Sequence, residues 1–158
     1  MTRIQYGALP YRIDIRGQME ILLVTSRRSR RWIIPKGWPI KGLKPALSAA
    51  REAFEEAGVV GQVDAQDVGR FSYLKLLEKS QRSVECEVIV FPLLVEQQLQ
   101  SWPEAAQREC RWVSTDEAVA MASDAGLKAV IHCADHRYIF EGGRYRVAAK
   151  YTTLRTPG

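Results

Sequence analysis

An abrupt change in sequence character around Lys44 limits the folds open to this chain more than any other feature. Residues 36–44 contain three residues that break regular structure, Gly37, Pro39 and Gly42, which predicts an ordered loop. Pro45 suits the first turn of a helix, and Gly58 supplies a C-terminal stop. Between them, apolar residues recur at helical spacing: Leu47, Ala50, Phe54 and Ala57. The sequence therefore predicts a loop that leads directly into a helix.

Strands are expected on both sides of this loop and helix. Runs of β-prone residues predict strands within 4–15, 20–25, 32–34, 68–77, 84–95 and 110–113. A helix-start pattern at Thr115 predicts helical structure from there to about Tyr138. This order indicates an α/β fold with a mixed β-sheet sandwiched between helices in three α/β/α layers. A chain of 158 residues fits one domain, with a core at about 5–140.

Composition excludes several classes of protein. No apolar run approaches the roughly 18 residues of a membrane span, and the N-terminus lacks the apolar core of a signal peptide. We therefore expect a cytoplasmic protein with no membrane partner. The three cysteines, Cys86, Cys110 and Cys133, are widely spaced and form no CxxC pair. They indicate neither a disulfide framework nor a thiolate zinc site.

The charges are segregated along the chain. A formal net charge of +5 favours an anionic partner. Every charged residue from Arg27 to Arg51 is basic, and three glutamates follow at once, Glu52, Glu55 and Glu56. On a helix these carboxylates project to one side, where their repulsion and the helix dipole are unfavourable. A solvated acidic face is one interpretation, and a divalent cation that binds carboxylate oxygens is the other.

The loop and helix together favour the cation. Gly37 and the run from Arg51 to Val59 resemble the Nudix box in residue type and in spacing, with Gly58 as the box's last glycine. Two positions depart from the family pattern, since Leu43 stands where the first glutamate belongs and Ala53 fills the first aliphatic position. The resemblance implies a Nudix fold and a Mg²⁺-dependent hydrolase of diphosphate linkages, with Mn²⁺ as a substitute ion.

Flanking segments are similar to one branch of that family. Residues 31–37 and 108–118 resemble the diphosphoinositol polyphosphate phosphohydrolases, which also cleave dinucleoside polyphosphates. The resemblance implies one of these two phosphorylated small molecules as the substrate. Four basic residues are our candidates for phosphate contacts: Arg31, Lys36, Arg82 and Arg111. The other interpretation of such residues is a solvated hairpin tip.

The roles within the site follow from the same resemblance. Glu52, Glu55 and Glu56 are the predicted metal ligands, and Glu52 and Glu55 the predicted catalytic residues, with Glu55 either a ligand or the general base. A further ligand is expected among a carboxylate outside the box, Glu104 or Glu109, and a backbone carbonyl near Lys36 or Gly37. Two alternatives remain open. One is an RNA 5′-pyrophosphohydrolase, and the other is a non-catalytic binding module, for which Leu43 is the main support.

Overall fold

The computed structural model describes the backbone of residues 2–77, 79–141, 144–147 and 153–155, with side chains up to residue 135. The helices are α1 (Pro45–Ala57), α2 (Thr115–Met121) and α3 (Ala125–Arg137). The strands are β1 (Thr2–Ile13), β2 (Met19–Thr25), β3 (Trp32–Ile33), β4 (Lys36–Gly37), β5 (Val59–Asp64), β6 (Gly69–Leu77), β7 (Arg82–Gln98), β8 (Cys110–Ser114), β9 (Tyr138–Glu141), β10 (Arg144–Val147) and β11 (Thr153–Arg155).

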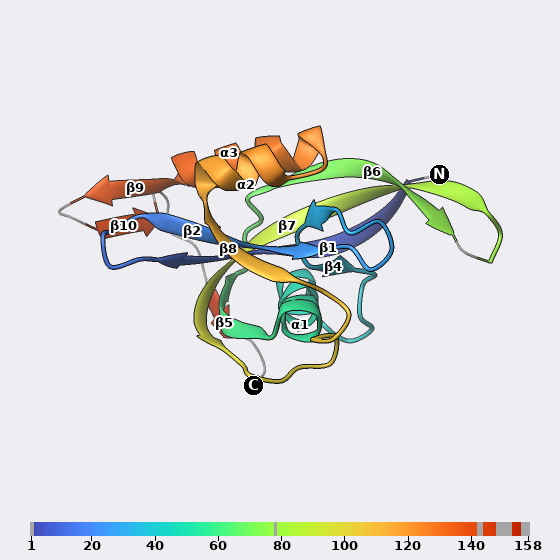
Figure 1. The fold of residues 1–158 in the computed structure, drawn as a ribbon, viewed down its shortest axis with the longest axis horizontal. Coiled ribbons are helices and arrows are strands. Elements are labelled where there is room, and N and C mark those ends of the chain that lie inside the picture. The colour runs from blue at the N-terminus through green and yellow to red at the C-terminus, as the bar shows by residue number, and fades with distance from the viewer. Residues whose placement is uncertain (1, 78, 142–143, 148–152, 156–158) are drawn as a thin grey trace.

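Nine of the described strands form one mixed sheet. Within it, β1 pairs in parallel with β7 and antiparallel with β2 and β4. Helix α1 lies on one side of this sheet, and α2 and α3 lie on the other (Figure 1). Each side buries its own cluster of apolar side chains. The predicted fold, a mixed sheet between two helical layers, is confirmed.

Helix α1 has the bounds predicted from the sequence. It begins at Pro45 and is closed by Gly58, whose φ of 67° is in the left-handed region that favours glycine. Its buried face differs from the predicted apolar stripe, because Leu47 and Phe54 are only half-buried. Five alanines form the contact with the sheet instead: Ala46, Ala49, Ala50, Ala53 and Ala57. The unusual Ala53 of the box is thus part of a close helix–sheet contact.

Strand β5 was not predicted from the sequence. Gly61 interrupts its apolar pattern, and a glycine inside a strand weakens the sequence signal for a strand. The structure explains this glycine, because the register between β5 and β7 shifts between Val60 and Gly61. A Cβ at Gly61 would overlap the carbonyl oxygen of Leu94. The residue is therefore fixed by the close approach of two backbones at a bulge.

One further element corrects the predictions. Lys36 and Gly37, expected within a loop, form the short strand β4. The helical structure expected from Thr115 to about Tyr138 is present as two helices, α2 and α3. Between them, the Ser123 amide donates to the Trp32 carbonyl at 3.1 Å. The strands predicted within 68–77 and 84–95 are present as β6 and β7, whose hairpin extends to the right of the body in Figure 1. None of the described helices is long and apolar enough to cross a membrane.

Candidate metal and phosphate site beside helix α1

The three glutamates of the box lie on α1 and are buried to different degrees. Glu56 is only 3% exposed, whereas Glu52 and Glu55 are half-buried. The Glu52 carboxylate lies against the backbone of β4, since a Cβ added to Gly37 would overlap it. The glycine predicted as part of the motif therefore has a steric role here, which is to let the carboxylate approach the main chain.

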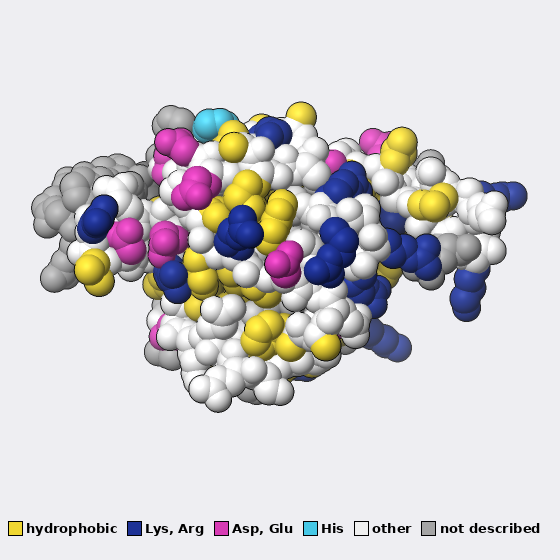
Figure 2. Space-filling model, in the orientation of Figure 1, with side chains coloured by type: hydrophobic (Ala, Val, Ile, Leu, Met, Phe, Trp, Pro, Cys, Tyr) yellow, Lys and Arg dark blue, Asp and Glu magenta, His cyan; other side chains and the backbone are white. Residues whose placement is uncertain are grey.

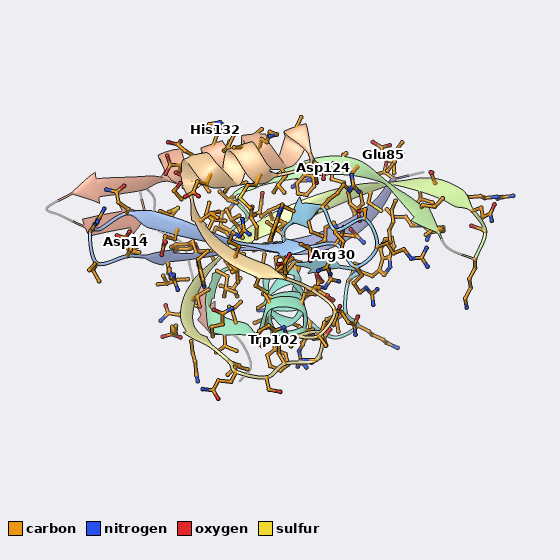
Figure 3. The ribbon with its side chains drawn as sticks, viewed as in Figure 1. Asp14, Arg30, Glu85, Trp102, Asp124 and His132 are labelled. Atoms are coloured by element: carbon orange, nitrogen blue, oxygen red, sulfur yellow. The ribbon has the colours of Figure 1, made fainter. Side chains whose placement is uncertain are left out.

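The loop between β7 and β8, residues 99–109, is tied to the C-terminal end of α1. The Glu104 amide donates to the Glu55 carbonyl at 3.0 Å, and the Trp102 indole Nε1 donates to the Glu56 carbonyl at 3.2 Å. The Leu99 amide donates to the Gly58 carbonyl at 2.7 Å. These bonds satisfy carbonyl groups that a helix end leaves without partners. Figure 3 labels Trp102, which lies by α1.

The same loop brings a fourth carboxylate and an arginine to the box. The Arg108 Nη2 lies 3.0 Å from the Glu104 Oε1 and 3.4 Å from the Glu56 Oε1. Its Nη1 donates to the Thr25 carbonyl at 3.1 Å. The Arg108 side chain is only 9% exposed, so this ion pair is largely screened from water. Glu109, the other carboxylate considered from the sequence, is exposed, and its amide donates to the Thr25 hydroxyl at 2.9 Å.

Burial makes negative charge unfavourable at this cluster. Burial raises the pKa of Glu56 to about 8, and the negative charge of Glu52 contributes to the same shift. The positive charge of Arg108 opposes this shift. The pKa of Glu52 is also raised, first by burial and then by Glu55, whereas a side-chain hydrogen bond with Glu56 lowers it. Such a bond requires a proton on one of the two carboxyl groups.

The chemistry of these groups fits a hard divalent cation. Glu52, Glu55, Glu56 and Glu104 offer carboxylate oxygens, which are the ligands that Mg²⁺ and Mn²⁺ prefer. Within the described part of the chain, no three acidic, histidine or cysteine side chains already converge as a finished metal site. The Arg108 guanidinium contacts two of the carboxylates, those of Glu56 and Glu104. The cluster therefore has the donor set for a cation, and Arg108 offsets part of its negative charge.

Of the four basic residues predicted to bind phosphate, Lys36 lies beside the cluster. Its amide donates to the Glu56 Oε2 at 3.4 Å, and its Nζ lies 4.7 Å from the centre of the Tyr73 ring. The Tyr73 hydroxyl in turn donates to the Gln5 Oε1 at 2.6 Å. Burial lowers the pKa of Lys36 to about 8, and the charge of Glu56 opposes that shift. The backbone of Lys36 thus contacts the box, and its ammonium group lies over an aromatic ring.

The other three basic residues lie elsewhere. Arg31 is exposed and donates to the Ser29 hydroxyl at 3.1 Å. Arg82 lines a cavity of about 680 Å³ at the β6–β7 hairpin. The Arg111 guanidinium lies over the Trp32 ring at 5.1 Å. None of the three has a described contact with a box glutamate. In Figure 2, however, lysine and arginine side chains gather on the right of the molecule, toward the β6–β7 hairpin.

The basic segment before β3 contacts the β7–β8 loop. The Arg30 Nη1 donates to the Gln107 carbonyl at 3.0 Å, and the Arg27 Nε lies 4.0 Å from the Glu104 Oε1. The side chain of Arg51, the arginine of the box, has no hydrogen bond or ion pair with another described residue. Sequence reasoning did not single out Arg108 or Trp102 as site residues, because they belong to a loop that has no periodic pattern.

Comparisons with known proteins agree with this geometry. The NUDIX domain model matches residues 5–132. Nudix hydrolase 21, chloroplastic, from Arabidopsis thaliana is 34% identical over 131 residues, covering 79% of this chain and 62% of that protein. Diphosphoinositol polyphosphate phosphohydrolase 3-alpha from Homo sapiens is 33% identical over 103 residues, covering 63% of this chain and 58% of that protein. The match thus spans less than two thirds of either relative's length.

A solved structure shows the same fold. The crystal structure of a C. elegans Ap4A hydrolase superposes with a TM-score of 0.60 and 18% sequence identity. The superposition covers 86% of this chain and 98% of that one. At this identity the likeness concerns the arrangement of helices and strands.

Proposed function

The chain belongs to the Nudix family, and from that premise we propose that it is a hydrolase that cleaves a phosphoanhydride linkage in a phosphorylated small molecule. The family predicted from residues 37–59 is confirmed by the match over residues 5–132. One observation carries the proposed activity: the Glu104 and Glu56 carboxylates lie on the same Arg108 guanidinium, at a place where burial raises the pKa of Glu56 to about 8. A divalent cation is the group that such oxygen ligands favour.

The four glutamates would have different roles in the reaction. Glu52 and Glu56 would hold Mg²⁺, with Mn²⁺ as a substitute, and Glu104 would add a further carboxylate. When bound, the ion would lower the pKa of a coordinated water and offset charge on the phosphoryl group. Glu55, half-buried at the edge of the cluster, would act as a ligand or as the general base that takes the water proton.

The basic residues would hold the anionic substrate. The Lys36 ammonium group, which lies over Tyr73, would contact the phosphoryl group that reacts. Arg31, Arg82 and Arg111 lie farther out and would contact other phosphates of a long substrate. We infer a dinucleoside polyphosphate or a diphosphoinositol polyphosphate as that substrate. The names of the human relative and of the C. elegans neighbour support this class.

Phosphate release with Mg²⁺ tests the proposal. The panel contains diadenosine polyphosphates, diphosphoinositol polyphosphates, nucleoside diphosphate conjugates and 5′-triphosphorylated RNA. We compare the wild type with Glu56→Gln, which keeps the size of the side chain and removes its charge. The matched control is Glu87→Gln, since Glu87 forms an ion pair with Arg70 at 3.2 Å and does not contact the box.

We expect one of the small molecules to be hydrolysed by the wild type and by Glu87→Gln, and to be left intact by Glu56→Gln. Release of pyrophosphate from RNA alone would replace the proposed substrate class with the RNA alternative. Equal background in all three proteins, with Mg²⁺ binding demonstrated, would instead favour a non-catalytic binding module.

A further inference from the structure

The structure assigns a positioning role to Arg108: it fixes the orientation of the Glu56 and Glu104 carboxylates in which they bind the cation. The inference rests on the proposed function, because it concerns the same metal site. Arg108 lies outside the box, about fifty residues after it. It acts through the two glutamates, without contacting the substrate itself.

Arg108 contacts only one oxygen of each carboxylate, which suits this role. Its Nε and Nη2 both contact the Glu104 Oε1, at 3.1 and 3.0 Å, and Nη2 also approaches the Glu56 Oε1 at 3.4 Å. The Glu104 Oε2 has no described partner. On Glu56, Oε2 faces the Lys36 amide at 3.4 Å. The guanidinium therefore orients each carboxylate through one oxygen and leaves the second oxygen outside the ion pair.

Arg108 is itself held from several directions. The Thr25 carbonyl accepts from its Nη1 at 3.1 Å, and the side chain is only 9% exposed. The loop that carries it is bonded to the end of α1 through Trp102 and the Glu104 amide. A guanidinium fixed on a fixed loop loses little further conformational freedom when it orients a carboxylate. The planar fork of an arginine is needed for this geometry, because a lysine ammonium group is a point charge.

Neither Arg51 of the box nor Lys36 beside it takes this role in the described structure. Arg51 is adjacent in sequence to Glu52, yet its side chain has no ion pair or hydrogen bond with a described residue. Lys36 approaches Glu56 through its amide, while its ammonium group lies over Tyr73. The only described ion pairs of Glu56 and Glu104 are with Arg108 and, at the longer distance of 4.0 Å, between Arg27 and Glu104.

An alternative role for Arg108, charge neutralisation alone, predicts the opposite effect on cation binding. If it only neutralised negative charge, its removal would free the carboxylates and strengthen cation binding, and a lysine would replace it fully. If it positions the carboxylates, its removal weakens cation binding, and a lysine does not restore it. Groups that orient metal ligands typically contribute about 10- to 100-fold to metal affinity.

The test is a titration of the metal-free protein with Mn²⁺, with free ion measured by electron paramagnetic resonance. The variants are Arg108→Gln, Arg108→Lys and the control Arg12→Gln, whose exposed arginine pairs with Glu20 at 2.8 Å. Urea unfolding of each protein shows which variants are folded at the temperature of the titration. Arg108→Lys keeps a buried positive charge, and it therefore provides the test if Arg108→Gln does not fold.

We expect Mn²⁺ to bind about tenfold or more weakly to both Arg108 variants, and equally to the wild type and Arg12→Gln. Tighter binding to Arg108→Gln, or wild-type affinity in Arg108→Lys, would overturn the positioning role while leaving the hydrolase proposal intact. Failure of the wild type to bind Mn²⁺ would overturn both.

Discussion

Replacing Gly58 with alanine tests whether the Trp102 indole, and not the backbone alone, requires a glycine at the end of α1. Gly58 has a φ of 67°, and a Cβ there would overlap the indole ring of Trp102. Gly42 has a similar φ of 85°, but no atom lies within 4 Å of the position of its Cβ. The two glycines therefore share the conformational cost of an alanine and differ in the steric one.

The expected magnitudes follow from this difference. A left-handed conformation costs an alanine about 1–2 kcal/mol, and the stiffer unfolded chain offsets about 0.4–1 kcal/mol of that loss. Gly42→Ala should therefore lower the free energy of unfolding by about 0–1.6 kcal/mol. Gly58→Ala adds overpacking against Trp102, which costs about 1–3 kcal/mol more.

Urea unfolding of a double-mutant cycle measures the steric part. The cycle contains Gly58→Ala, Trp102→Ala and the double variant, with Gly42→Ala as the separate control. In the Trp102→Ala background, the alanine at position 58 should cost no more than Gly42→Ala does, so the coupling energy equals the overpacking of about 1–3 kcal/mol. The reasoning is refuted if Gly58→Ala and Gly42→Ala cost the same, or if the excess cost of Gly58→Ala persists without the indole.

Three further predictions concern charge, the substrate and the C-terminal helices. In EDTA, the free energy of unfolding should pass through a minimum near pH 8. Folded Glu56, with its pKa raised to about 8, binds more protons than the unfolded chain at lower pH, whereas folded Lys36, with its pKa lowered to about 8, binds fewer at higher pH. A maximum near pH 8 in urea titrations would contradict this. Lys36→Gln should raise the KM of a hydrolysed substrate about tenfold, the loss expected for one hydrogen bond to a charged group. An unchanged KM would remove Lys36 from the binding site. Ser114→Ala should lower the free energy of unfolding by about 1 kcal/mol, because Ser114 caps α2 in a capping box with Glu117. A change below about 0.3 kcal/mol would show that the cap is not needed.

The sequence by itself determined the features that depend on local periodicity and local stereochemistry. Pro45 and Gly58 set the bounds of α1, since one lacks an amide hydrogen and the other adopts a left-handed φ. The helical repeat of 3.6 residues placed Glu52, Glu55 and Glu56 on one side of the helix before any tertiary contact was known. Spacing from Gly37 to Gly58 then sufficed to identify the family.

The tertiary structure decided which residues surround those glutamates, and how deeply each is buried. An irregular loop that is positioned by β7 and β8 brings three residues to the box: Glu104, Arg108 and Trp102. Because the loop is irregular, no periodic pattern in the sequence predicts that these residues lie there. Whether Glu56 is solvated or buried likewise depends on the sheet and on that loop. Its altered pKa arises from desolvation, which is a property of the packed molecule and cannot be read from a helical spacing.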